Sequence, residues 1–287
     1  MSARRRLDAE LVRRGLAPSR EQAQRDIAAG RVLVGGAPAS KPARLVHPGE
    51  ALVVQGPGPR FVSRAGAKLE GALERFEVDV TGWRVLDAGA STGGFTDCLL
   101  QRGVAEVIAV DVGYGQLHER VARDPRVVVI DRTNVRAIDV DLVGTPVDLV
   151  TADLSFISLR TVLDALLGVL RTDGEVVTLV KPQFEAGREA VARGKGIVSD
   201  PTVWRAVLDE VLSAFEERGA AIMGVMVSPI TGTDGNVEFL AHARRGATPS
   251  GSVAQMIDAA VVAATPPGGT DSVPPAADPV PPGESSR

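Results

Sequence analysis

A loop of small residues follows a short apolar run that ends at Asp87, and its residue types could bind a ligand. The stretch from Arg84 to Phe95 reads RVLDAGASTGGF, which predicts a strand, a tight glycine loop and then a helix. Glycines let the backbone turn sharply and let a ligand approach without a Cβ in the way. The glycine order differs from the dinucleotide fingerprint, and no lysine follows Gly94 as a P-loop would require, so a different adenosine ligand is indicated.

Two further carboxylates follow apolar runs in the same way, Asp111 after residues 107–110 and Asp131 after residues 127–130. The carboxyl ends of parallel strands lie on one edge of a sheet. An acid after the second strand can bind ribose hydroxyls, and one after the third can reach an adenine amino group. The glycines could merely shape a turn and the acids could cap helices, but three strand-end acids in series favour a site for S-adenosylmethionine.

Four charged residues on separate elements form a second candidate set: Lys68, Asp153, Lys181 and Glu238. Each has an ordinary explanation, because Asp153 could cap a helix, Lys181 and Glu238 could form a surface pair, and Lys68 could be an exposed helical charge. An unpaired charge among apolar residues is expensive to bury, however. The apolar runs around Lys181 and Glu238 therefore favour mutual pairing and a functional site beside the glycine loop.

Strands that alternate with helices must position these residues, and the pattern predicts a doubly wound α/β sheet of seven strands, the Rossmann-like sheet of methyltransferases. The expected strands are residues 84–87, 106–111, 127–131, 148–153, 175–181, 221–227 and 236–241. The expected helices are residues 63–76, 95–102, 116–124, 159–170 and 202–218. The last two strands have no helix between them, which predicts an antiparallel hairpin at that edge.

The first 55 residues predict a small α+β domain of two helices packed on a short hairpin sheet. One helix is expected over residues 4–17, and Ser19 opens a second, with Gln22 completing a capping box. Residues 1–60 carry eleven lysines and arginines against five acids, although the whole chain has a net charge of −4. A basic N-terminal domain on an acidic body suggests a polyanionic partner.

Composition narrows the classes of protein further. Cys98 is the single cysteine and the three histidines are scattered, so we expect neither a disulfide nor a structural metal, which fits a reducing cytoplasm. No window approaches eighteen apolar residues, so no membrane span is expected. We expect domains at residues 1–55 and 63–245, a linker at 56–62, a terminal helix at 246–264 and a disordered tail at 265–287.

The N-terminal stretch from Arg6 to Gly36, followed by residues 41–54, resembles the S4 RNA-binding domain. The resemblance implies that an arginine-lined helical face meets structured RNA through phosphate contacts and shape. For any single arginine a solvated surface charge is the simpler explanation, but for the whole patch the resemblance favours RNA. The RNA-binding candidates are Arg4, Arg6, Arg20 and Lys41.

The four charged residues resemble the Lys-Asp-Lys-Glu tetrad of FtsJ-like ribose 2′-O-methyltransferases, and DAGASTGGFTD, residues 87–97, stands where that family has its cofactor loop. Ser91-Thr92 departs from the Ala-Pro of the stand-alone enzymes. An S4-like domain joined to such a domain resembles the TlyA family of ribosomal RNA 2′-O-methyltransferases, whose members are also called hemolysins. The expected cofactor contacts are Asp87, Gly89, Ala90, Ser91, Gly93, Gly94, Phe95, Asp111, Asp131 and Asp153.

The resemblance implies an in-line methyl transfer from S-adenosylmethionine to a ribose hydroxyl of ribosomal RNA, in free form or in a ribosomal subunit, without a metal. Lys181 is expected to activate the hydroxyl, with Lys68 orienting it, Asp153 positioning Lys181 and Glu238 holding the lysines and the ribose. A membrane-active, hemolysin-like protein and a non-catalytic RNA-binding factor are the alternatives.

Overall fold

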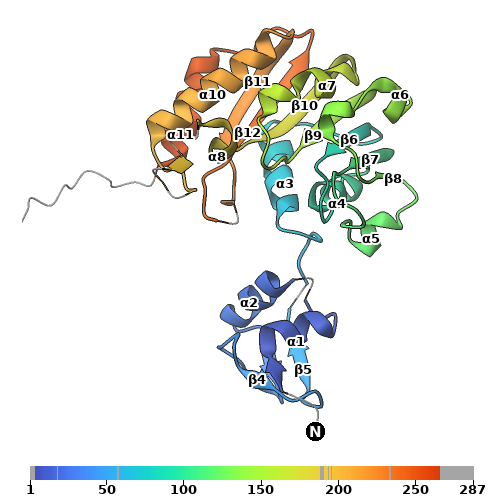
Figure 1. Cartoon of the computed structure of the whole chain (residues 1–287), viewed down its shortest axis with the longest axis vertical. Coiled ribbons are helices and arrows are strands. Elements are labelled where there is room, and N and C mark those ends of the chain that lie inside the picture. Colours follow the sequence, from blue (N-terminus) through green and yellow to red (C-terminus); the bar gives the residue numbers. More distant parts are fainter. Residues whose placement is uncertain are drawn as a thin grey trace, which may run out of the picture.

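The computed structural model describes residues 4–17, 19–56, 58–187, 191–192, 194, 196–232 and 234–265, so residues 266–287 of the tail expected at 265–287 lie outside it. A small N-terminal domain and a larger α/β domain are joined by an extended linker that leads into helix α3, Ala65–Arg75 (Figure 1). The site expected from the sequence therefore has to be assembled within the larger domain, with the small domain beside it.

The large domain is built on a seven-stranded sheet with the order β11-β12-β10-β9-β6-β7-β8. Strands β6 to β10 are parallel, whereas β12 runs antiparallel to both β10 and β11. This confirms the doubly wound fold with an antiparallel edge hairpin. The strands are β6 (Arg84–Ala88), β7 (Glu106–Val110), β8 (Val127–Ile130), β9 (Val147–Ala152), β10 (Leu170–Val180), β11 (Ala220–Val227) and β12 (Phe239–Arg245).

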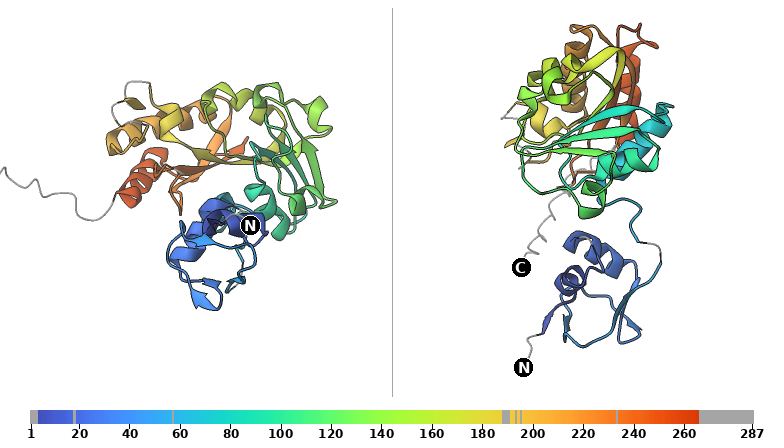
Figure 2. Two further views of the ribbon diagram at one scale, coloured as in Figure 1. Left: turned by 60° about the horizontal axis from the view of Figure 1, so that its bottom comes forward. Right: turned by 90° about the vertical axis from the view of Figure 1, so that its right-hand side faces the viewer.

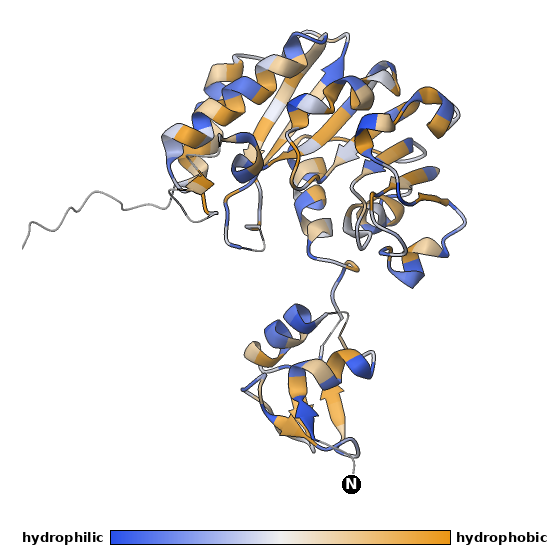
Figure 3. Ribbon diagram, viewed as in Figure 1, coloured by the Kyte–Doolittle hydropathy of each residue, from blue (hydrophilic) through white to orange (hydrophobic). Residues whose placement is uncertain are grey.

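Helices cover both faces of this sheet, and a separate apolar cluster lies under each layer (Figure 2). Leu69 of α3 and Leu99 of α4 belong to one cluster; Leu163 of α7, Leu208 of α10 and Ile257 of α11 belong to the other. Figure 3 shows the apolar residues concentrated along the strands between these layers. The remaining elements are α4 (Gly94–Gln101), α5 (Glu119–Ala122), α6 (Val140–Val143), α7 (Leu163–Gly168), α8 (Pro182–Glu185), α10 (Pro201–Glu216), α11 (Val253–Ala264), η1 (Val135–Ala137) and η2 (Leu159–Thr161).

The N-terminal domain packs two helices over short strands around its own core. Ser19 caps α2 by accepting a hydrogen bond from the Gln22 amide at 3.1 Å, as the sequence predicts, but the Gln22 side chain donates to Asp26 at 2.7 Å instead of completing the expected capping box. The helix expected over residues 4–17 is shorter, because Arg5 and Arg6 pair as a strand with Leu45 and Val46. The elements are β1 (Arg5–Arg6), α1 (Leu7–Arg13), α2 (Arg20–Ala28), β2 (Val32–Val34), β3 (Ala37–Pro38), β4 (Leu45–Val46) and β5 (Leu52–Val54).

Several expected elements of the large domain also differ from the structure. The helix expected at 159–170 is divided into η2 and α7, and the terminal helix expected at 246–264 begins only at Val253. Strand β10 begins at Leu170, because a register shift between Leu170 and Glu175 lets an irregular stretch continue the strand. The helix expected at 116–124 is reduced to α5. The strand expected at 236–241 is β12, which begins only at Phe239. Glu238 therefore belongs to the loop that joins the last two strands, where its carbonyl accepts the Ser228 amide.

Asp87 anchors the glycine loop from behind. Its side chain is fully buried, and its carboxylate accepts hydrogen bonds from the hydroxyls of Thr96 in α4 (2.6 Å) and Thr151 in β9 (3.2 Å). Burial raises the pKa of the Asp87 carboxyl to about 6, and the charge of Asp153 adds to the effect. Asp87 thus fixes the start of α4 against two central strands.

We predict that Asp87→Asn weakens the pH dependence of stability. Because the folded-state pKa lies above the unfolded value of about 3.9, this carboxyl contributes stability below about pH 4 that is lost as the pH rises through about 6. The difference in unfolding free energy, variant minus parent, should therefore be about 2 to 3 kcal/mol larger at pH 7 than at pH 4. Urea unfolding of both proteins at each pH measures this; parallel pH curves would contradict it.

Candidate active site

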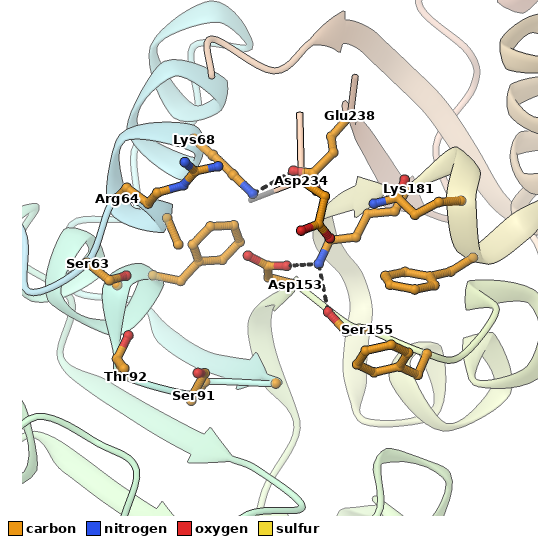
Figure 4. A pocket seen from close by; sticks show the side chains of 18 of the residues that line it. Ser63, Arg64, Lys68, Ser91, Thr92, Asp153, Ser155, Lys181, Asp234 and Glu238 are labelled. Carbon is orange, nitrogen blue, oxygen red and sulfur yellow. Dashed lines mark hydrogen bonds and ion pairs between the residues drawn. The ribbon is translucent and has the colours of Figure 1, made fainter. Parts of the chain in front are cut away.

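A cavity of about 390 Å³ opens at the carboxyl edge of the sheet, which is within the size range of small-molecule sites. Its walls come from the start of α3, the glycine loop, the segments that follow β9 and β10, and the loop before β12 (Figure 4). Of the expected site residues, the cavity is lined by Lys68, Gly89, Ala90, Ser91, Gly94, Phe95, Asp153, Lys181 and Glu238.

The first charged pair joins the helix α3 to the loop before β12. The Lys68 ammonium donates to the Glu238 carboxylate at 2.5 Å, although 170 residues separate them in the chain. Both residues are buried, with 5% and 3% of their surface exposed. Such a pair persists in the interior only because each charge neutralises the other.

The second pair joins the ends of β9 and β10. Lys181 Nζ lies 2.5 Å from Asp153 Oδ1 and donates to Ser155 Oγ at 3.1 Å. Lys181 is 7% exposed, whereas the Asp153 side chain is 17% exposed and faces the cavity (Figure 4). The four charged residues thus form two ion pairs at one cavity, in the pairing Lys68–Glu238 and Lys181–Asp153.

The glycine loop has the shape of a ligand cradle. Gly89 has a φ of +81°, and a Cβ there would come within 2.8 Å of the Asp153 carbonyl oxygen. A Cβ on Gly94 would collide with the Ser63 hydroxyl. Small residues are therefore required where the loop passes the cavity, and the residues present fit the close approach of an adenosine-type cofactor.

Four expected cofactor contacts lie outside the cavity lining. Asp87 stands behind the loop, as described above, and Gly93 packs toward Leu117 with a φ of +89°. Asp111 accepts the amides of Ser91 (2.8 Å) and Gly113 (2.6 Å), and Asp131 accepts the Gly115 amide at 2.9 Å. Both carboxylates therefore brace the turn beyond β7, and Asp111 also braces the glycine loop beyond β6 on the same edge of the sheet.

Phe156 is the most unusual of the lining residues that the sequence did not single out. Its ring is 91% exposed, and its backbone has a φ of +63°, a conformation that costs a non-glycine residue of order 1–3 kcal/mol. The ring lies 5.1 Å from that of Phe184. Phe156 lies three residues after Asp153, and Phe184 lies three residues after Lys181. This position after a charged strand end is the only feature of the sequence that could have indicated the two rings. The other lining residues that were not predicted are Glu21, Ser63, Arg64, Ala65, Thr92, Ser155, Gln183, Phe184 and Asp234.

The four RNA-binding candidates are exposed on the N-terminal domain, but two of them share a buried partner. Arg6 and Arg20 reach the fully buried carboxylate of Asp8 at 2.9 and 3.0 Å. The hydrogen bond from Arg6 is the main cause that holds the pKa of Asp8 well below its usual range. Asp8 thus fixes the direction of both guanidinium groups.

Arg64 connects the two domains at the mouth of the cavity. Its guanidinium lies 3.2 Å from Glu21 of α2 and donates to the carbonyl of Thr231 in the loop before β12. The same side chain therefore contacts the basic domain and the loop that carries Glu238.

Among the residues that the structure describes, no group of three or more His, Cys, Asp and Glu side chains is placed to hold a metal ion. Within the same part of the chain, no helix has the length and apolar character needed to cross a lipid bilayer.

The family model of the FtsJ-like methyltransferases matches residues 61–245, and that of the S4 domain matches residues 5–52. The chain is 53% identical over 240 residues to the "16S/23S rRNA (cytidine-2'-O)-methyltransferase TlyA" of Mycobacterium tuberculosis, covering 83% of this chain and 89% of that protein. It is 48% identical over 242 residues to "Putative rRNA methyltransferase YqxC" of Bacillus subtilis, covering 84% and 86%.

Among solved structures, a "Putative hemolysin from Streptococcus thermophilus" matches with a TM-score of 0.73 and 40% identity, covering 92% of this chain and 96% of that one. Sequence and structure thus relate the whole two-domain arrangement, and not the sheet alone, to one group of proteins. The chain therefore belongs to the TlyA family of S-adenosylmethionine-dependent ribosomal RNA 2′-O-methyltransferases.

Proposed function

We propose that this chain methylates the 2′-hydroxyl of a cytidine in ribosomal RNA and that Lys181 activates this hydroxyl. The cytidine is the nucleoside in the printed name of the Mycobacterium tuberculosis relative. The observation that carries the proposal is the meeting of two lysine–carboxylate pairs with the glycine loop at one cavity. The cofactor supplies a methyl group on a sulfonium, and the glycine loop with Asp111 and Asp131 would hold it along the sheet edge.

Lys181 is positioned to act on a hydroxyl in the cavity. Its amine, when neutral, accepts the hydroxyl proton, and the Asp153 carboxylate at 2.5 Å stabilises the ammonium that forms. Ser155 holds the same nitrogen from another side at 3.1 Å and so limits its rotation. A nitrogen held in this way presents one fixed direction toward the incoming oxygen.

Lys68 and Glu238 form the opposite wall and would orient the ribose. Because their ion pair spans α3 and the loop before β12, it sets the width of the cavity between these elements. Lys68 has further donor hydrogens for a ribose oxygen, since an ammonium carries three.

Phe156 would stack on the base of the target nucleotide. An exposed aromatic ring at the cavity that Lys181 lines offers a flat surface that bases in single-stranded or flipped-out form bind well. The nearby ring of Phe184 supports it at 5.1 Å. The left-handed backbone is what turns the ring outward instead of into the apolar core.

We predict that Lys181→Ala lowers the rate of methyl transfer by about 10²- to 10⁴-fold, the range typical of a lost acid–base group. Labelled S-adenosylmethionine and ribosomal subunits, followed by mapping of ribose methylation, measure the rate. The affinity for S-adenosylmethionine should change little. Arg205→Ala, which removes an exposed arginine paired with Asp258 on distant helices, is the control and should retain the parental rate.

The opposite pattern would reverse the assignment of the two lysines. If Lys181→Ala kept the parental rate while Lys68→Ala abolished transfer, Lys68 would be the activating group. If both variants kept the rate, neither pair would belong to the chemistry.

We predict that Phe156→Ala raises the KM for RNA by about five- to 150-fold, because stacking of a base on an aromatic ring is worth about 1–3 kcal/mol. The exposed ring makes few contacts within the protein, so the thermal midpoint of unfolding should stay near the parental value. Steady-state kinetics with varied RNA concentration measures the change. An unaltered KM would exclude the stacking role.

We predict that replacing Arg4 and Lys41 together by alanine weakens RNA binding and lowers its salt dependence, by about one unit of slope for each lost phosphate contact. Arg4 and Lys41 are chosen because Arg6 and Arg20 form ion pairs with the buried Asp8. Removing either of those arginines would leave the Asp8 charge partly unpaired and could destabilise the domain. Filter binding across a salt series measures the slope. The charge-matched control is Arg205→Ala with Arg218→Ala, and an equal effect of that control would contradict a specific RNA face.

A further inference from the structure

A buried carboxylate lies just outside the cavity and has no part in the chemistry described above. Glu185 ends the short helix α8 that follows Lys181, and its side chain is 3% exposed. Burial raises the pKa of Glu185 above its ordinary value, so the fold keeps this acid in place against a desolvation penalty. Such a penalty calls for specific partners.

The partners of Glu185 belong to the segment that carries Phe156. Its Oε2 accepts the hydroxyl of Ser158 at 2.6 Å, and its Oε1 accepts the amide of Leu159 at 2.7 Å. Ser158 is the residue before η2, and its own side chain makes no capping bond to that helix. Glu185 therefore caps η2 from a different part of the chain.

The segment between Asp153 and Ser158 is thus held at one end by Lys181, which precedes α8, and at the other end by Glu185, which ends α8. At one end Lys181 binds Asp153 and Ser155; at the other end Glu185 binds Ser158 and Leu159. Phe156 lies between the two attachments, with its φ of +63° and its ring exposed. A strained backbone persists only where its surroundings hold it from both sides.

We propose that Glu185 is a positioning residue that holds Phe156 in its outward conformation for RNA binding. This inference rests on the proposed role of Phe156 as a stacking surface. Because the Lys181–Asp153 pair holds the other end of the segment independently, Glu185 acts on the affinity for RNA and not on the chemical step. The glycine loop makes no hydrogen bond to Glu185 among the described contacts, so cofactor affinity is independent of it.

The test compares Glu185→Ala with the parent protein in steady-state kinetics on ribosomal subunits. We expect the KM for RNA to rise about tenfold, as a fraction of the effect of losing the stacked ring itself, with kcat within about threefold and S-adenosylmethionine affinity unchanged. If Glu185 only stabilised the fold, Glu185→Ala would lower the apparent kcat and leave KM unchanged, because a smaller fraction of the protein would be folded. An unchanged KM overturns the proposal.

Three further variants make the result specific. Glu185→Gln retains an acceptor for Leu159 and a side-chain group for Ser158, and should restore most of the affinity. Ser158→Ala removes a single hydroxyl, should raise KM in the same direction, and carries the test if Glu185→Ala does not fold. Glu210→Ala removes the other carboxylate beside Arg160 and leaves the contacts of Glu185 intact, so its KM should match the parent.

A double-mutant cycle separates this proposal from the function on which it rests. In the Phe156→Ala background, Glu185→Ala should raise KM by less than about twofold, because the ring it positions is already absent. A full tenfold effect in that background overturns the positioning role and leaves the stacking role intact. A parental KM for Phe156→Ala alone would instead remove the stacking role.

Discussion

The need to neutralise charges in the interior governs the architecture of this site. Removing one member of a buried ion pair commonly destabilises a protein by about 3–5 kcal/mol, because the other charge stays buried and uncompensated. Lys68 on α3 therefore has to meet Glu238, and Lys181 has to meet Asp153. The first pair ties the beginning of the catalytic domain to its last hairpin, and the second ties two neighbouring strands. The same contacts that satisfy the charges close the walls of the cavity.

This constraint explains why the convergence of Lys68, Asp153, Lys181 and Glu238 could be predicted from the sequence. Lysine and glutamate beside runs of apolar residues indicate pairing, and the parallel order of the strands puts their carboxyl ends on one edge. The glycine order of the loop indicates a close-approaching ligand. The choice of partners was less predictable, because Lys68 and Glu238 lie 170 residues apart and only the docking of α3 on the sheet brings them together.

Features that depend on a distant partner were predicted less well. The strand at Arg5–Arg6 exists because Leu45–Val46 pairs with it, and local helix propensity gave no sign of that pairing. Phe156 is a similar case, since an aromatic residue after an apolar strand is usually buried. Its exposure results from a left-handed backbone, and nothing in the residues around it indicates this conformation. Asp87 shows the reverse, because this carboxylate near the end of β6 was expected to contact a ligand and instead accepts hydrogen bonds from two buried threonines.

Helix α3 joins the constraint on charge to the arrangement of the two domains. The linker from the N-terminal domain enters this helix directly, Arg64 at its start contacts Glu21 of that domain, and Lys68 lies one turn further on. Arg64 also holds the carbonyl of Thr231 in the loop that leads to Glu238. A displacement of the basic domain would therefore act on both partners of the Lys68–Glu238 pair through one side chain. Since that pair lines one wall of the cavity, the domain proposed to bind RNA and the wall proposed to bind the ribose are linked through Arg64 and helix α3.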